Sequence, residues 1–136
     1  MAHRDYSQDE DYFTQDFVRD GIVSVWIGLS DCSSDMNTDV LQDLCGVGYY
    51  SLDNQEGNNF DFQLLPVCVL LKELSYSSSF IEVAVEKANT MGLRQARWAV
   101  VQYDFEYSPT KVKRNIAADP VFIGTFEYSM QEKRDA

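Results

Sequence analysis

Basic residues are almost missing from the first half of this 136-residue sequence. Residues 1–71 contain 13 acidic side chains but only two basic ones, Arg4 and Arg19. Residues 72–136 contain nine of each, so the net charge of −11 comes entirely from the first half. This charge argues against nucleic acid and anionic membranes as ligands, because both would be repelled. It favours a basic partner attracted over a distance, the alternative being that the charge serves only solubility.

Histidine occurs once, at His3, in a polar N-terminal stretch. Without a histidine inside the domain, neither a Ser-His nor a Cys-His nucleophile pair can be assembled. The same shortage excludes metal sites built on clusters of His and Cys. No glycine-rich turn follows a strand and opens a helix, as phosphate-binding loops require. We therefore expect no catalytic site of these kinds, no metal and no cofactor.

The three cysteines form no close pair: they are Cys32, Cys45 and Cys68. They lie in or near apolar surroundings, so we expect buried free thiols in a reducing compartment rather than disulfides or a zinc site. Apolar runs stay well below the ~20 residues of a membrane-spanning helix. The acidic N-terminus lacks the apolar run of a signal peptide. We expect a cytoplasmic protein that does not associate with membranes.

Hydrophobic patterns predict three strands and three helices. The strands are expected where β-branched and aromatic residues gather, at about 22–28, 96–107 and 120–129. The helices are expected from apolar residues at helical spacing, at about 36–45, 64–74 and 79–91. The last of these begins with a capping box formed by Ser79 and Glu82. Residues 47–59 are rich in Gly, Asn and Asp, and predict a loop with at most a short strand at 49–52.

These elements predict an α+β fold, a two-layer sandwich with a small, mostly antiparallel sheet and helices packed on one face. The first strand is apolar on both faces and should be central, while the last two can pair through their connection. In the long strand, Tyr103, Phe105 and Tyr107 should share one face, and Asp104 and Glu106 the other. A single domain is expected over 21–129, with an acidic mobile tail at 1–20 and a polar end at 130–136.

Acidic side chains are the candidate binding residues. Aspartate recurs every four residues, at Asp35, Asp39 and Asp43, and these side chains should line one face of the first predicted helix. Each like-charge pair at this spacing costs roughly a few tenths of a kcal/mol. A sequence tolerates such a row of like charges more readily when the row faces a partner rich in Arg and Lys. The alternative interpretation is a solvated helix face without a partner. The predicted partner-binding residues are Asp35, Asp39, Asp43, Asp53, Glu56, Asp61, Asp104 and Glu106.

Asp104 and Glu106 also support a hypothesis from another class. Two carboxylates on one side of a strand could hold a hard cation, or divide acid and base roles in a metal-binding hydrolase. The simpler interpretation is a solvated sheet edge with ion pairs to nearby basic residues. A third hypothesis is an acidic adaptor or nucleic-acid mimic.

Four short stretches carry a family resemblance. They are VSVWIG at 23–28, SYSSSF at 75–80, YDFEY at 103–107 and FIGTFEY at 122–128. None is specific alone, but in this order and spacing they resemble the bacterial Immunity protein 22 family of polymorphic toxin systems. The resemblance implies a small cytoplasmic protein that binds and blocks a cognate toxin domain and so protects the producing cell, as in contact-dependent inhibition. It implies no catalysis and no cofactor.

The chain departs from the family pattern between Leu44 and Asp53. The family tends to carry Phe-Gly and then an acidic Tyr-Asp stretch there, which suggests that partner specificity has diverged in this segment. Resemblance and charge together predict a non-enzymatic inhibitor whose acidic face covers the basic cleft of a toxin domain. A nuclease fits best, because its cleft must be basic to hold phosphate.

Overall fold

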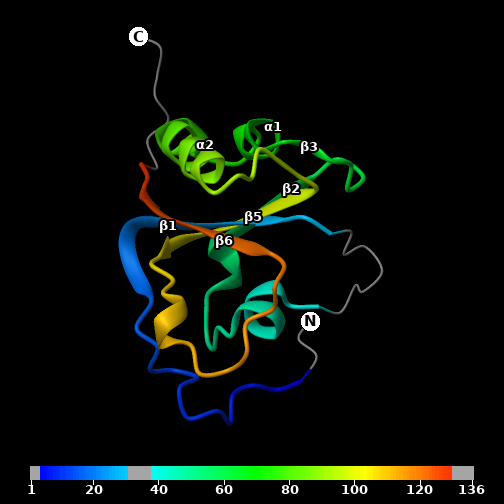
Figure 1. Cartoon of the computed structure of the whole chain (residues 1–136). Coiled ribbons are helices and arrows are strands. Elements are labelled where there is room, and N and C mark those ends of the chain that lie inside the picture. The colour runs from blue at the N-terminus through cyan, green and yellow to red at the C-terminus, as the bar shows by residue number, and fades with distance from the viewer. Residues whose placement is uncertain (1–3, 31–37, 130–136) are drawn as a thin grey trace.

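The computed structural model describes residues 4–30 and 38–129 and has a mixed order of elements (Figure 1). The strands are β1 (Val18–Gly28), β2 (Gln55–Asn59), β3 (Leu65–Pro66), β4 (Gln95–Ala96), β5 (Trp98–Phe105) and β6 (Val121–Glu127). The α-helices are α1 (Val67–Lys72) and α2 (Ile81–Thr90), and a π-helical segment, η1, spans Val40–Leu44. Short 3₁₀ turns span Leu52–Asn54, Ser77–Ser79 and Pro109–Lys111. The predicted α+β class is confirmed.

A four-stranded antiparallel sheet forms the centre of the molecule, in the order β2-β5-β1-β6. As predicted, β1 is a central strand. The predicted direct pairing of the last two strands is wrong, because β1 lies between β5 and β6. A strand that is apolar on both faces gains most from an inner position, where both faces are covered. β3 and β4 form a separate two-stranded sheet.

The edge strand β2 lies in the stretch that was predicted to be a loop, and no strand forms at 49–52. Its sequence, QEGNN, has no alternation of apolar and polar residues. Its backbone pairs with β5, from Gln55 opposite Gln102 to Asn59 opposite Trp98. Pairing with an apolar neighbour therefore makes this a strand, and local composition does not reveal such a tertiary effect.

α1 and α2 lie within the predicted helical ranges but are shorter. Leu65 and Pro66 form β3 instead of a first helical turn. The predicted capping box does not form, because Ser79 Oγ donates to the carbonyl oxygen of Tyr76 at 2.7 Å and no side chain caps α2. Within the described residues, no helix is long and apolar enough to cross a membrane.

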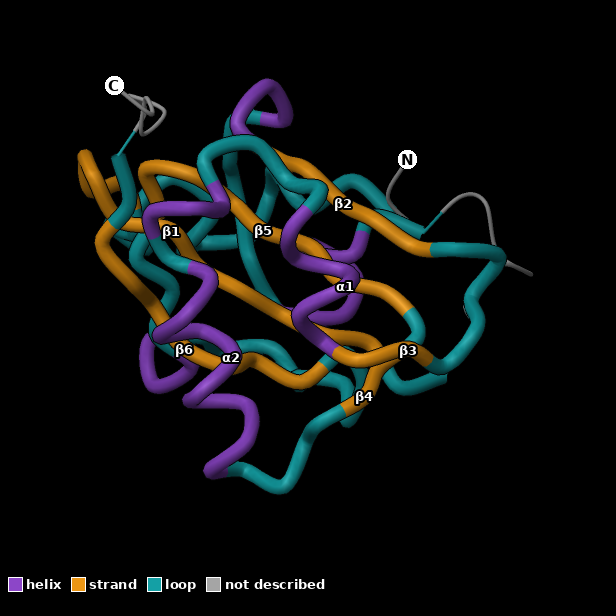
Figure 2. The backbone as a smooth tube through the Cα atoms, turned by 90° about the horizontal axis from the view of Figure 1, so that it is seen from above, coloured by secondary structure: helices purple, strands orange, loops and turns teal. Residues whose placement is uncertain are grey.

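Side chains pack on both faces of the sheet. α1 and α2 cover one face (Figures 1 and 2), where Val23, Val25 and Ile27 of β1 join the larger core. The other face carries Trp26 and Trp98 and is covered by η1 and the N-terminal segment. The first predicted helix, at 36–45, is thus reduced to η1 and lies on the face opposite α1 and α2. Residues 36 and 37 of it lie outside the described residues.

The predicted alternation along β5 breaks at Asp104. This residue has a left-handed backbone, with φ of 56°, and the register of β1 against β5 shifts beside it. Tyr103 consequently packs beneath the helices, whereas Phe105 and Tyr107 pack on the other face, so the common face predicted for all three is wrong. Ser24 supplies hydrogen bonds where the backbone pairing of β1 with β5 is interrupted. Its buried Oγ donates to the Phe105 carbonyl oxygen at 2.6 Å and accepts from the Tyr107 amide at 2.9 Å.

Candidate partner-binding surface

The N-terminal segment, residues 4–17, is held against the loop that follows η1. Gln15 is buried and bonds this loop twice: its amide nitrogen donates to the Gly46 carbonyl oxygen at 2.9 Å, and its oxygen accepts from the Gly48 amide at 2.7 Å. A Cβ at Gly48 would lie 2.5 Å from the carbonyl oxygen of Tyr12, so only glycine allows this approach. The Tyr49 amide donates to the same oxygen at 2.8 Å. This segment, expected as part of a mobile tail, therefore makes specific contacts with the domain.

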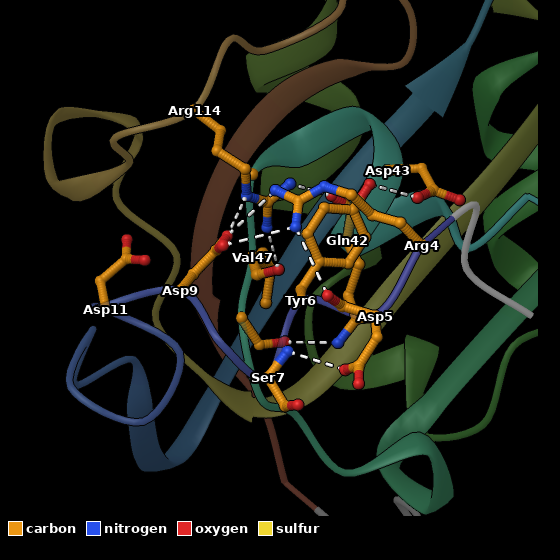
Figure 3. Close-up of polar contacts among 12 residues, drawn as sticks. Arg4, Asp5, Tyr6, Ser7, Asp9, Asp11, Gln42, Asp43, Val47 and Arg114 are labelled. Atoms are coloured by element: carbon orange, nitrogen blue, oxygen red, sulfur yellow. Dashed lines mark hydrogen bonds and ion pairs between the residues drawn. The ribbon is translucent and has the colours of Figure 1, made fainter.

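Tyr6 fixes the start of the N-terminal segment (Figure 3). Its ring is buried between two guanidinium groups, with Arg4 at 4.1 Å and Arg114 at 4.0 Å from the ring centroid. Its hydroxyl donates to Asp43 Oδ1 at 2.5 Å. Burial and, next, the Asp43 carboxylate raise the pKa of Tyr6. The segment is thereby joined to η1.

Arg114, from the connection between β5 and β6, joins three separate parts of the chain (Figure 3). Its guanidinium donates to the carbonyl oxygens of Gln42 at 2.5 Å and Val47 at 2.7 Å. It also forms an ion pair with Asp9 at 3.2 Å. Arg114 thus shares the Asp9 carboxylate with Arg4, which pairs with it at 3.3 Å, and holds η1 and the loop that follows it.

Asp39 and Asp43 make hydrogen bonds within the protein. Asp39 caps η1, accepting from the Gln42 amide at 3.0 Å and from the Tyr50 hydroxyl at 2.8 Å. Asp43 accepts from the Asp39 amide at 2.9 Å in addition to Tyr6. Both side chains are half-buried. The row expected to project from a helix face therefore has two members that also stabilise the fold, and Asp35 lies outside the described residues.

Glu56 likewise has partners within the protein, whereas Asp53 and Asp61 are exposed. The Glu56 carboxylate accepts from the Ser75 amide at 2.8 Å, from the Ser75 hydroxyl at 2.9 Å and from the Tyr103 hydroxyl at 2.9 Å. It thereby ties β2 to the turn after α1. Asp53 and Asp61 remain available to solvent.

Asp104 and Glu106 have separate partners. Asp104 Oδ1 accepts from the Gly21 amide at 2.9 Å and from the Tyr128 hydroxyl at 2.8 Å. These two hydrogen bonds stabilise the bulge, which is the register shift between β1 and β5 beside Asp104. Glu106 forms an ion pair with Arg19 at 3.2 Å. The strand does not leave two free carboxylates side by side, as the hydrolase hypothesis requires.

An aromatic patch, formed by Tyr12, Phe13 and Tyr49, lies where the N-terminal segment meets the loop after η1. Phe13 stands 4.6 Å from Tyr12 and 5.7 Å from Tyr49, measured between ring centroids. Phe13 is 74% exposed and Tyr49 is 55% exposed. Beside the patch is a hollow of about 190 Å³, whose lining includes Asp16 and Val18. The structure thus exposes apolar surface in the most acidic part of the chain.

The model of one protein family, described as Immunity protein 22, matches residues 2–129. The chain belongs to the Immunity protein 22 family. The resemblance found in the sequence is thereby confirmed, and membership supports an immunity function. The comparison with curated proteins found no match, and neither did the comparison with solved structures.

The aromatic patch of this Immunity protein 22 member was not found by the sequence analysis. The aromatic residues of the N-terminal stretch follow no helical or strand period, so the sequence allowed either an anchor for a partner or packing on the domain itself. The sequence carries no local signal for the patch, because its exposure depends on how the N-terminal segment docks on the loop after η1.

Metal binding and thiol chemistry find no support in the described part of this Immunity protein 22 member. Among the described residues, no group of three or more His, Cys, Asp or Glu side chains could hold a metal ion. Cys45 is a buried free thiol, as predicted, and burial raises its pKa to about 12, which keeps it protonated. Cys68 is free but exposed, so the prediction of burial is wrong there. Cys32 lies outside the described residues.

Alkaline pH should destabilise this Immunity protein 22 member through its buried phenols. Burial, and then a neighbouring carboxylate, raises the pKa of Tyr50, Tyr103 and Tyr128. Their contribution to stability is complete below the ordinary phenol pKa of about 10 and is lost as the pH rises above it. We expect the free energy of unfolding to fall above about pH 10, by up to about 1.4 kcal/mol per pH unit for each phenol.

Urea denaturation at a series of pH values measures this effect, with tyrosinate absorbance followed in parallel. In the folded protein the three phenols should ionise later than in urea. Complete tyrosine ionisation near pH 10 with the fold intact would contradict the prediction.

Proposed function

We propose that this protein neutralises a nuclease toxin domain by binding its cationic surface through the acidic first half of the chain. The observation that carries the proposal is membership of the Immunity protein 22 family over residues 2–129. An immunity protein acts by binding, so a non-enzymatic mode is part of the proposal. The nuclease is proposed to act in the cytoplasm, where the cell's nucleic acid lies.

The distribution of charge supports a nuclease as the partner. The net charge of −11 comes from residues 1–71. A nuclease cleft must carry positive charge to hold phosphate, so an acidic protein would be drawn to it and would exclude nucleic acid from it. An interface of standard size, ~1,600 Å², suffices for tight binding.

The predicted partner-binding residues would contribute in two ways. Asp53 and Asp61 are exposed, so they are proposed to contact the toxin directly. Those with internal hydrogen bonds, Asp39, Asp43, Glu56 and Asp104, and the ion-paired Glu106, are proposed to contribute mainly through their charge, which steers association. Asp35 is proposed as a contact from its sequence position alone.

Co-expression with a toxin domain tests the proposal. The probe is the C-terminal domain of the protein encoded directly upstream in the source genome. We expect this protein to restore growth to cells that express the domain and to co-purify with it. Survival without the protein, or separate purification of the two chains, would overturn the proposed function.

Charge reversal tests the role of the acidic surface. Asp53→Lys combined with Asp61→Lys should slow association with an inactivated toxin domain about tenfold at low salt, and less at high salt. Glu82→Lys combined with Glu86→Lys is the matched control, because it changes the net charge equally on exposed positions of α2. If the two double variants associate equally slowly, total charge and not this surface governs association.

A further inference from the structure

The exposure of the aromatic patch has no explanation within the fold. Phe13 and Tyr49 leave more than half of their surface in solvent, and Val18 at the rim of the neighbouring hollow is 68% exposed. Single exposed apolar side chains are ordinary, but a contiguous aromatic group usually marks an interaction site. Gln15 and Phe17 already anchor the segment in buried positions. Phe13 is therefore not needed to hold the segment in place.

The hollow beside the patch combines apolar walls with one free carboxylate. Phe13, Phe17, Val18 and Tyr49 contribute to its lining together with Asp16. Asp16 is exposed, and no Lys or Arg in the described part of the chain lies within ion-pair distance of it. Its backbone is left-handed, with φ of 62°, and the residues on either side of it, Gln15 and Phe17, are both buried. The volume of about 190 Å³ equals roughly six water molecules in the liquid, enough for one long side chain.

We propose that this hollow receives an arginine side chain of the toxin domain, a proposal that rests on the proposed function. The guanidinium would stack on the exposed rings of Phe13 and Tyr49 and pair with the Asp16 carboxylate. Its methylene groups would lie along Val18. Arginine suits the site better than lysine, because its planar, weakly hydrated group stacks on aromatic rings and also pairs with carboxylates.

Charge complementarity selects a cationic protein over a second copy of this chain. Two copies that met through this surface would bring together two segments that each hold 13 acidic side chains and two basic ones within residues 1–71. Repulsion between them would oppose a symmetric dimer. A basic nuclease domain would meet attraction at the same surface, and aromatic side chains that bury an arginine are the usual centres of binding energy.

Affinity measurements with the inactivated upstream-encoded domain test the proposal. We expect Phe13→Ala to weaken binding about 30-fold and Asp16→Asn about tenfold, mainly through faster dissociation. Asparagine tolerates the left-handed backbone, so Asp16→Asn removes only the charge. Val83→Ala is the control, since Val83 is an exposed apolar residue of α2, and it should leave affinity unchanged. All three variants should melt within about 2 °C of the wild type, because surface changes perturb stability little.

A double-mutant cycle identifies the bound side chain. Each exposed arginine of the toxin domain is changed to lysine and measured against the wild type and Phe13→Ala. One position should weaken wild-type binding about tenfold and have little further effect on Phe13→Ala. Tight binding by the wild type that Phe13→Ala leaves unchanged would overturn the arginine site and leave the immunity function standing. No binding by the wild type would overturn both. A dimer of the wild type that Phe13→Ala dissociates would show that a second copy occupies the surface.

Discussion

Replacing Trp26 with alanine should lower the free energy of unfolding by about 4 kcal/mol. Trp26 is 1% exposed, and its ring centroid lies 5.1 Å from that of Tyr107 and 5.4 Å from that of Phe122. It is a central member of the core that joins the sheet to η1 and the N-terminal segment. Its removal leaves a cavity that the rigid sheet cannot close, which adds to the lost burial of the ring.

Hydrogen exchange would show that this loss falls on one face of the sheet. In Trp26→Ala, the amides of η1 and of Gly48 should lose protection before those of α2, because local opening follows the weakened layer. Phe80→Ala is the comparison: Phe80 is equally buried in the core beneath the helices and should give the reverse order at a similar total cost. Equal loss on both faces in both variants would mean that the two cores unfold as one unit.

Replacing Arg114 with alanine should cost about 3 kcal/mol. The variant loses charge-assisted hydrogen bonds to the carbonyl oxygens of Gln42 and Val47, the ion pair with Asp9 and the contact with the Tyr6 ring. The Arg114 side chain is 21% exposed, so water replaces only part of these interactions. Urea denaturation measures the change.

Two further variants separate the geometry of Arg114 from its charge. Arg114→Lys keeps the charge but cannot reproduce a planar group that donates in several directions, so it should recover less than half of the loss. Lys113→Ala removes a neighbouring cation whose ion pair with Glu10, at 3.7 Å, is between largely exposed side chains. It should cost less than about 0.5 kcal/mol. Full recovery in Arg114→Lys would reduce the role of Arg114 to simple charge compensation.

The strands at the centre of the fold could be predicted because their side chains carry the pattern. β1 is apolar on both faces and occupies an inner position, as its composition indicated. β2 could not be predicted, since Gln55–Asn59 becomes a strand only through backbone pairing with β5. The bulge was equally hidden: a left-handed residue within an alternating sequence reverses every face assignment after it, and Asp104 has no local signal that marks it.

The candidate site was predicted in its charge but not in its shape. The sequence shows how many carboxylates the first half contains, but not which of them accept hydrogen bonds within the protein. Asp39 and Asp43 stabilise η1, and Glu56 ties β2 to a turn, because each finds a hydroxyl or amide donor from a distant part of the chain. The aromatic patch depends on the docking of the N-terminal segment, a long-range contact with no period in the sequence.

The close approach of Gly48 to the backbone of Tyr12 has a consequence for how such proteins diversify. The loop that contains Gly48 leaves no room for a side chain beneath the N-terminal segment. A lineage that alters one of these two stretches must adjust the other in step. Swapping a single stretch between relatives would displace its neighbour, so new specificities should be inherited as matched pairs of segments.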